Sequence, residues 1–107
     1  MDAMTQTEAL PHPRREEIRI ESVLQALADP IRLRIVSELD KIGESVACGT
    51  IQLPISKSTR THHLRILREA GVTLVRPDGT ARMTTLRRED LDALYPGMLD
   101  AILNAKH

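Results

Sequence analysis

The sequence predicts a mainly helical α+β domain with about five helices and one two-stranded hairpin. Three observations predict it. Apolar residues recur at helical spacing over most of the chain, the spacing changes to alternate residues after Gly71, and the strong hairpin signal Asp78-Gly79 follows. With 107 residues, 41% of them hydrophobic, the chain is long enough for one core and one domain.

The composition excludes several classes of protein. Tyr95 is the single aromatic residue, so the core must be aliphatic and the aromatic platforms of single-strand binders are missing. Cys48 is the single cysteine, which excludes an internal disulfide framework and CxxC-type zinc modules. No apolar run reaches the roughly 18 residues of a membrane span, and no signal peptide is recognisable. We therefore expect a cytoplasmic protein with no membrane partner.

The N-terminal half divides into an arm and two helices. Residues 1–14 contain two prolines and no periodicity, which predicts a flexible arm before a domain over 15–107. An apolar stripe at i, i+3, i+4 and i+7 predicts a first helix from Arg15 to about Ala28. Asp29-Pro30 then suits the N-cap and first residue of a second helix, about 30–41.

The middle of the chain predicts a short helix followed by a basic one. A third helix is expected over Val46–Leu53, although Gly49 weakens it. Ser56 is a good N-cap for a fourth helix that runs to Ala70, and Gly71 is its stop signal. A short helix, a tight turn and a basic helix follow the order of a helix-turn-helix unit.

A hairpin and a last helix complete the prediction. Strands are expected over Val72–Arg76 and Thr80–Leu86, joined at Asp78-Gly79, where we expect positive φ at both residues. A hairpin directly after the basic helix is typical of a wing. An apolar stripe over 91–103 predicts a last helix, with a break near Tyr95 because a proline follows it.

The balanced net charge hides an asymmetry. The chain has 15 basic and 15 acidic residues, but the window Lys57–Arg88 holds eight basic and two acidic residues, a net charge of +6. The rest of the chain therefore carries −6. This distribution indicates a surface that faces a polyanion, with an ordinary solvated charged face as the alternative.

The fourth helix presents one polar face. Ser58, Thr61, His62 and Arg65 lie together at i, i+3, i+4 and i+7, opposite its apolar residues. Hydroxyls can bind bases or phosphates, and arginine can pair bidentately with guanine. Alone, the pattern also fits an amphipathic surface helix. The turn before it, the hairpin after it and the basic window favour double-stranded DNA. The candidate DNA-binding residues are Ser56, Lys57, Ser58, Thr61, His62, Arg65, Arg68, Arg76, Thr80 and Arg82.

Two residues of this helix depart from the simple pattern. His63 lies on the core side, where we expect a structural histidine. Arg60 lies at the edge of the core face, so we expect its stem to follow apolar neighbours while its guanidinium reaches the DNA backbone. Neither His62 nor His63 is expected to bind a metal.

Two segments carry a family resemblance that covers about residues 18 to 95. VLQALADPIRLRI, residues 23–35, resembles the "LADPTRLRIL" opening of the ArsR/SmtB family of bacterial winged-helix repressors. SKSTRTHHLRILREAGV, residues 56–72, is similar to the recognition helix of that family. The resemblance implies a winged helix-turn-helix homodimer formed largely by the first and last helices. It also implies a repressor that binds an inverted-repeat operator through the helix 56–70 and the wing 72–86, until a signal relieves repression.

Many members of this family sense metals, but their ligand patterns are not reproduced. The positions of a Cys-x-Cys pair correspond to Ser45 and Ala47, and an Asp-x-His pair on the last helix corresponds to Asp90 and Asp92. Because soft metals favour thiolates and zinc or nickel favours imidazole, we expect no metal site and no cofactor. A metal-responsive regulator remains an alternative.

The sequence leaves two further alternatives open and argues against an enzyme. Cys48 lies close to the predicted DNA-reading unit, so it is either a redox switch or a small buried residue. A winged helix could also serve protein contacts, with vestigial DNA binding. No pattern pairs a nucleophile with a base or two carboxylates in a cleft, so an enzyme is not expected.

Overall fold

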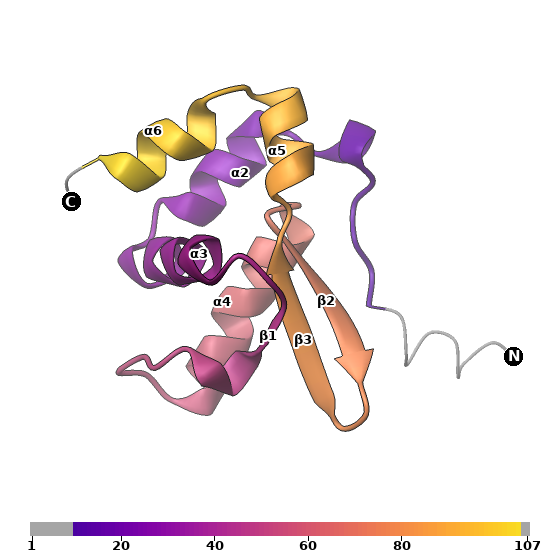
Figure 1. Cartoon of the computed structure of the whole chain (residues 1–107), viewed down its shortest axis with the longest axis vertical. Coiled ribbons are helices and arrows are strands. Elements are labelled where there is room, and N and C mark those ends of the chain that lie inside the picture. The colour runs from indigo at the N-terminus through magenta and orange to yellow at the C-terminus, as the bar shows by residue number, and fades with distance from the viewer. Residues whose placement is uncertain (1–9, 106–107) are drawn as a thin grey trace, which may run out of the picture.

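The computed structural model describes residues 10–105 (Figure 1). Its α-helices are Ile20–Leu27 (α2), Pro30–Ile42 (α3), Lys57–Glu69 (α4), Arg88–Leu94 (α5) and Met98–Asn104 (α6). Two short 3₁₀ helices are Arg15–Glu17 (η1) and Cys48–Thr50 (η2). The strands are Val46–Ala47 (β1), Thr73–Asp78 (β2) and Ala81–Leu86 (β3). This mainly helical α+β architecture confirms the predicted fold class.

The sheet is antiparallel with strand order β1-β3-β2. In the long hairpin, Thr73 pairs with Leu86 at one end and Asp78 with Ala81 at the other. Figure 1 shows this hairpin projecting beside α4, while α5 and α6 lie at the opposite end of the molecule together with α2. The sequence predicted two strands, and β1 is a third one that pairs with β3.

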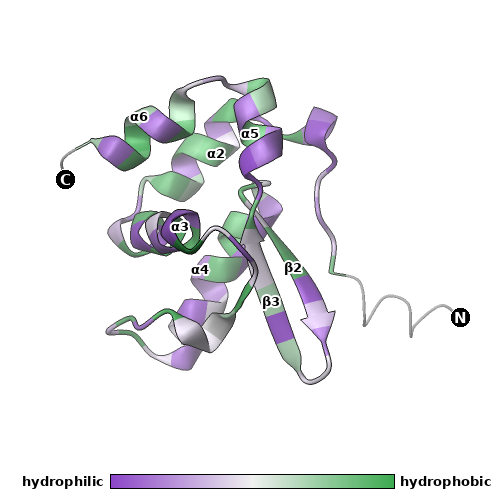
Figure 2. Ribbon diagram, viewed as in Figure 1, coloured by the Kyte–Doolittle hydropathy of each residue, from purple (hydrophilic) through white to green (hydrophobic). Residues whose placement is uncertain are grey.

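The core is aliphatic, as the composition requires. Figure 2 shows hydrophobic and hydrophilic residues alternating along α4, and Leu67 of this helix is fully buried. Burying one such side chain contributes about 1.5–3 kcal/mol. The largest fully buried hydrophobic residues come from all five α-helices and from the residue before β2: Ile35, Leu39, Leu67, Leu91, Leu99, Val23, Val36 and Val72.

Both predicted ends of α4 are confirmed. The Ser56 hydroxyl caps the first turn by accepting a hydrogen bond from the backbone N–H of Thr59, at 3.2 Å. At the other end, the N–H of Val72 donates to Leu67 O at 2.9 Å and the N–H of Gly71 donates to Arg68 O at 3.1 Å. This pair of bonds is a Schellman motif, which requires the left-handed backbone that Gly71 adopts at φ 88°.

The first helix differs from its prediction. A continuous helix from Arg15 is wrong, because η1 ends at Glu17 and the backbone is extended at Ile18 before α2 begins. The extended residue lets the Ile18 side chain reach the core, where it is 7% exposed. The cap of α3 is confirmed: the Asp29 carboxylate accepts from Ile31 N at 2.9 Å and Arg32 N at 3.1 Å.

The short third helix expected over Val46–Leu53 is wrong. Its first residues form β1, where Val46 pairs with Thr84 and Ala47 with Met83. The next three residues form the single turn η2. Pairing with a strand nearly forty residues away satisfies the backbone and outweighs a helix propensity that glycine already weakens.

The hairpin turn is in the predicted place but has a different geometry. Asp78 is the last residue of β2, so the loop consists of Gly79 and Thr80. Only Gly79 of the predicted pair has positive φ, at 65°, and the expectation for Asp78 is therefore wrong. Glycine at the first loop position suits a type II′ turn, which needs one residue at positive φ and not two.

The break in the last helix is confirmed. α5 ends at Leu94 and α6 begins at Met98, on either side of Pro96. The described residues therefore contain five α-helices, as predicted, although the third of the predicted set is absent and the last is divided. None of the described helices combines the length and the apolarity needed to cross a membrane.

We predict that Gly71→Ala destabilises the protein more than Gly43→Ala. Both glycines end a helix at positive φ, with φ values of 88° and 78°, so each substitution forces alanine into the left-handed region at a cost of about 1–2 kcal/mol. At Gly71 a Cβ would also lie 2.6 Å from Ile18 Cγ1, whereas at Gly43 it would meet nothing within 4 Å. Urea unfolding of both variants measures the difference. Equal losses would show that Ile18 does not constrain this turn.

Candidate nucleic-acid interface

The predicted face of α4 is exposed. Ser58, Thr61, His62 and Arg65 are all accessible, while Leu67 is fully buried on the other side of the helix. A helix with this amphipathic pattern packs its apolar stripe on the core and presents the polar stripe outward. The facing assigned from the sequence is therefore confirmed, and the four polar side chains form one accessible surface.

A groove of about 640 Å³ runs between α4 and the β2–β3 hairpin. Its lining contains five cationic side chains, and the tip of the hairpin contributes Thr80 and Ala81. The Nε atoms of two of these side chains are buried and have no hydrogen-bond partner among the described residues. Two N–H donors beside the groove are therefore unpaired within this part of the chain. We name this feature the cationic groove. Its cations are Lys57, Arg60, Arg65, Arg68 and Arg82, and the two with an unpartnered Nε are Arg60 and Arg68.

The structure brings together most of the candidate residues. Six of them line the cationic groove: Lys57, Thr61, Arg65, Arg68, Thr80 and Arg82. The other four are exposed but lie outside its lining: Ser56, Ser58, His62 and Arg76. The Ser56 hydroxyl already has partners within the protein, because it caps α4 and also contacts Thr59 Oγ1 at 2.9 Å. Arg60, which the sequence placed at the edge of the core face, also lines the groove, and its contact with the DNA backbone stays a prediction.

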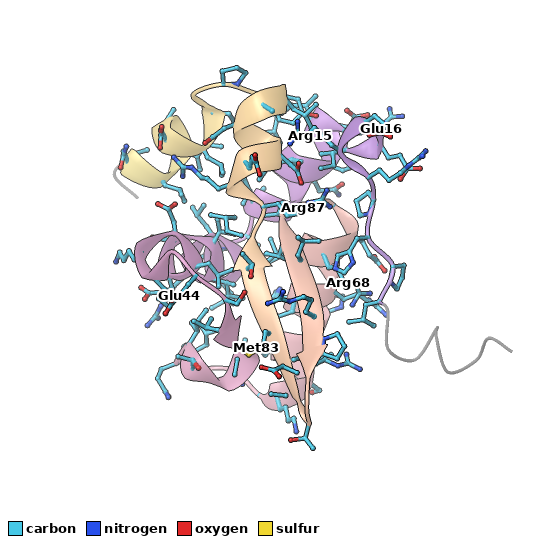
Figure 3. All side chains as sticks on the ribbon, turned by 45° about the vertical axis from the view of Figure 1, so that its right-hand side comes forward. Arg15, Glu16, Glu44, Arg68, Met83 and Arg87 are labelled. Carbon is cyan, nitrogen blue, oxygen red and sulfur yellow. The ribbon has the colours of Figure 1, made fainter. Side chains whose placement is uncertain are left out.

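Arg87 belongs to the basic window of the sequence but not to this surface. Its side chain is only 6% exposed. Its Nε donates to Asp90 Oδ2 at 2.8 Å, and its Nη1 donates to Pro13 O at 2.7 Å. Figure 3 shows Arg87 at the end of the hairpin near α5. This arginine therefore holds elements together.

Arg88 is likewise engaged within the molecule. It donates to Asp40 at 3.0 Å and to Asp92 at 3.1 Å, and it also contacts Asp100. These acidic residues come from α3, α5 and α6. The positive charge counted over the window thus overstates the charge available to a polyanion, because its last two arginines are paired.

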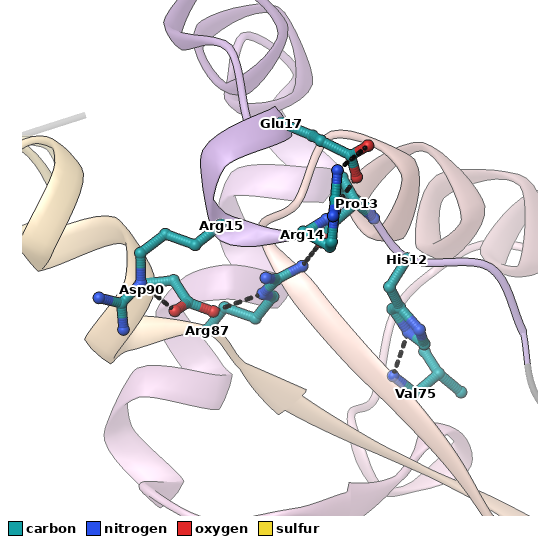
Figure 4. Close-up of polar contacts among 8 residues, drawn as sticks. All are labelled: His12, Pro13, Arg14, Arg15, Glu17, Val75, Arg87 and Asp90. Carbon is teal, nitrogen blue, oxygen red and sulfur yellow. Dashed lines mark hydrogen bonds and ion pairs between the residues drawn. The ribbon is translucent and has the colours of Figure 1, made fainter.

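The N-terminal segment lies against β2, a feature that sequence reasoning missed. We name residues 10–14 the strap. The ring Nε2 of His12 accepts a hydrogen bond from Val75 N at 3.0 Å (Figure 4). Leu10 lines the cationic groove. Burial lowers the pKa of His12, and the nearby charges of Arg68 and Arg87 lower it further. A neutral imidazole is the form that accepts this bond. Residues 1–9 of the expected flexible arm lie outside the described part of the chain.

Comparison with known proteins agrees with this geometry. A helix-turn-helix domain model matches residues 27–76. The chain is 33% identical over 89 residues, 81% of its length and 88% of the relative's, to YceK of Bacillus subtilis (strain 168), named an uncharacterized HTH-type transcriptional regulator. It is 32% identical over 74 residues, 68% of its length and 70% of the relative's, to the arsenical resistance operon repressor of Staphylococcus xylosus.

The chain belongs to the ArsR family of winged helix-turn-helix transcriptional regulators.

Solved structures share the fold of this ArsR-family chain. An ArsR-like transcriptional regulator from Rhodococcus sp. RHA1 has a TM-score of 0.62 at 22% identity, covering 76% of both chains. The transcriptional repressor BigR from Xylella fastidiosa has a TM-score of 0.60 at 24% identity, covering 81% of this chain and 88% of that one. The chain is therefore a DNA-binding transcriptional regulator. In its winged helix-turn-helix fold, α4 is the basic helix and the β2–β3 hairpin is the wing.

The positions that correspond to metal ligands elsewhere in the ArsR family have other partners here. Asp90 pairs with Arg15 and Arg87, and Asp92 pairs with Arg88. Across residues 10–105, no group of three or more His, Cys, Asp or Glu side chains could hold a metal ion. Cys48 begins η2, but its side chain lies outside what the structure describes, so the alternatives of a redox switch and a small buried residue both stay open.

We predict that Asp90→Asn lowers the free energy of unfolding at pH 7 by roughly 1–3 kcal/mol, because it leaves the buried Arg87 without its anion. Burial raises the pKa of Asp90, but hydrogen bonds and charge from Arg15 and Arg87 outweigh burial and hold that pKa below its ordinary value. The stabilisation is therefore complete above the pKa of an unfolded aspartate, and it is lost as the pH falls through the lower folded pKa.

Urea unfolding between about pH 7 and 3 measures this effect, since the variant should show a shallower decline in acid. Glu89→Gln, which alters an exposed neighbour, serves as the control and should follow the wild type. Parallel pH profiles for the Asp90 variant and the wild type would contradict the assignment.

Proposed function

We propose that the chain is a dimeric repressor that places α4 in the major groove of an inverted-repeat operator. The observation that carries the proposal is the cationic groove beside the exposed polar face of α4. A helix of this diameter fits the major groove, and the wing on the other side of the cationic groove can then follow the backbone. The repressor names of two relatives, from Staphylococcus xylosus and Bacillus subtilis (strain 168), support the direction of regulation.

The exposed side chains divide by the contacts they can make. Ser58, Thr61, His62 and Arg65 form the accessible face of α4, so we assign them to base edges and nearby phosphates. The remaining basic and hydroxyl residues flank that face or lie on the wing, so we assign them to phosphates. They are Ser56, Lys57, Arg60, Arg68, Arg76, Thr80 and Arg82.

The dimer is assigned to the first and last helices. Ile20 and Leu24 of α2 are 37% and 47% exposed, and their i, i+4 spacing places them on one face of the helix. α6 carries the partly buried Ile102 and Leu103. Pairing two copies through these helices would bury the exposed residues and space two α4 helices by one turn of DNA, about 34 Å. The protein would act in the cytoplasm, with double-stranded DNA and a second copy as partners.

We predict that Arg65→Ala and Arg82→Ala weaken DNA binding in different ways. Arg65→Ala should cost about 1–3 kcal/mol on a selected operator and relax the base preference, because an arginine on the α4 face can read guanine. Arg82→Ala should weaken all sequences alike, since a wing residue meets the backbone. Fluorescence anisotropy on a selected duplex and on a random duplex of equal length separates the two effects.

Arg19→Ala is the matched control for these variants. Arg19 is 71% exposed and pairs with Glu21 at the start of α2, so its loss removes one positive charge without touching α4 or the wing. This control should bind both duplexes like the wild type. Unchanged operator affinity in the Arg65 variant would show that α4 does not read bases through this face.

Salt dependence distinguishes the repressor from a winged helix that binds other proteins. If the dimer contacts six or more phosphates, its affinity for DNA should fall by roughly 10³-fold between 50 and 200 mM salt, because bound counterions are released. The measurement is an anisotropy titration at several salt concentrations. Affinity that does not change with salt would overturn the proposed function and favour the protein-binding alternative.

A further inference from the structure

Arg32 joins three helices at one point. It lies in the first turn of α3, and its guanidinium uses three nitrogens. Nε donates to Ala26 O at 2.6 Å and Nη2 donates to Gln25 O at 3.4 Å, both in the last turn of α2. Nη1 contacts Nδ1 of His63, in the middle of α4, at 3.2 Å. One side chain thus connects the end of α2 with the centre of α4.

The tautomer of His63 follows from its hydrogen bond with Arg32. A guanidinium can only donate, so Nδ1 must be the acceptor and the ring proton must be on Nε2. The His63 side chain is 12% exposed. The carboxylate of Asp29 lies 4.0 Å from Nδ1. The charged or titratable groups facing His63 are therefore Arg32 from α3, Asp29 from its N-cap, and His62 next to it on α4, with ring centroids 5.8 Å apart.

The backbone of Arg32 is also held, by the N-cap of α3. Asp29 Oδ2 caps α3 by accepting from Arg32 N at 3.1 Å. Main chain and side chain are thus both held, so the guanidinium has a defined direction. This matters because the apolar packing of α4 is not directional, whereas hydrogen bonds weaken steeply when their geometry changes.

We propose that Arg32 is a positioning residue that sets the orientation of α4 relative to α2, acting through His63. His62, the next residue along α4, is on the exposed face assigned to DNA. A rotation of α4 at His63 would therefore move the side chains that read bases. Since α2 is also the proposed dimer helix, this contact fixes the reading face relative to the two-fold axis. The inference rests on the proposed function.

Two variants test the contact from both ends. Arg32→Lys keeps the positive charge and can still donate to an α2 carbonyl. A single ammonium cannot reproduce the three separate contacts of the guanidinium with Ala26, Gln25 and His63. His63→Leu removes the acceptor and keeps the packing volume. The probes are a duplex selected from a random library with the wild-type chain and a random duplex of the same length. The readout is the ratio of the two affinities, at a temperature where thermal unfolding shows each variant to be folded.

We predict that each variant lowers this selectivity ratio by about two- to thirtyfold, the range for residues that act on a site without touching its ligand. Affinity for the random duplex and its salt slope should not change, because the phosphate contacts remain. The double variant should lose little more than either single one, because both remove the same contact. Lowered thermal stability with an unchanged selectivity ratio would overturn the inference.

The two proposals fail in distinguishable ways. A wild-type chain that binds no selected duplex would overturn the proposed function and this inference together. A wild-type chain that binds selectively, alongside Arg32 and His63 variants of equal selectivity, would overturn the inference alone.

Discussion

The left-handed turn at Gly71 is where the parts of the molecule meet. It ends α4 through the Schellman bonds to Leu67 and Arg68, and it starts β2 within two residues. Ile18 packs directly against it from the N-terminal side. The carbonyl of Val72 then accepts from the N–H of Arg87 at 2.9 Å, which attaches the start of α5 to the same place. The angle between α4 and the wing, and so the shape of the cationic groove, depends on this turn.

Electrostatics divide the basic third of the chain between two tasks. Lys57, Arg65 and Arg82 lie along the groove, whereas Arg87 and Arg88 are held by carboxylates. The division follows position in the fold. The groove residues lie on α4 and near the tip of the hairpin, and the paired arginines begin where the hairpin returns to α5. Basic residues from one window of the chain therefore separate into those that line the cationic groove and those that pair with carboxylates.

Much of the fold could be predicted because its signals are local. The caps Ser56 and Asp29, the stop at Gly71 and the break at Pro96 each act within a turn or two of the residue that carries the signal. The exposed face of α4 followed from helical periodicity for the same reason. The groove itself required the hairpin to lie against α4, which the family resemblance implied but no local pattern specified.

The parts that could not be predicted depend on distant partners. Val46 becomes a strand residue because Thr84 lies beside it, and His12 is ordered because Val75 offers it an N–H. Arg87 was counted with the polyanion-facing residues because a net charge summed along the chain does not show where each side chain points. The Ile18 side chain likewise packs where Gly71 has no side chain, a contact that the sequence of the first helix does not reveal.

The strap lies along the open edge of the sheet, at β2. β2 is an edge strand, and an edge strand presents backbone donors to which a strand of another molecule can add. The imidazole of His12 occupies one of these donors, at Val75, where backbone pairing would otherwise extend the sheet. Because a side chain cannot itself continue a sheet, the N–H of Val75 is not available for pairing with a strand of another molecule while His12 accepts from it.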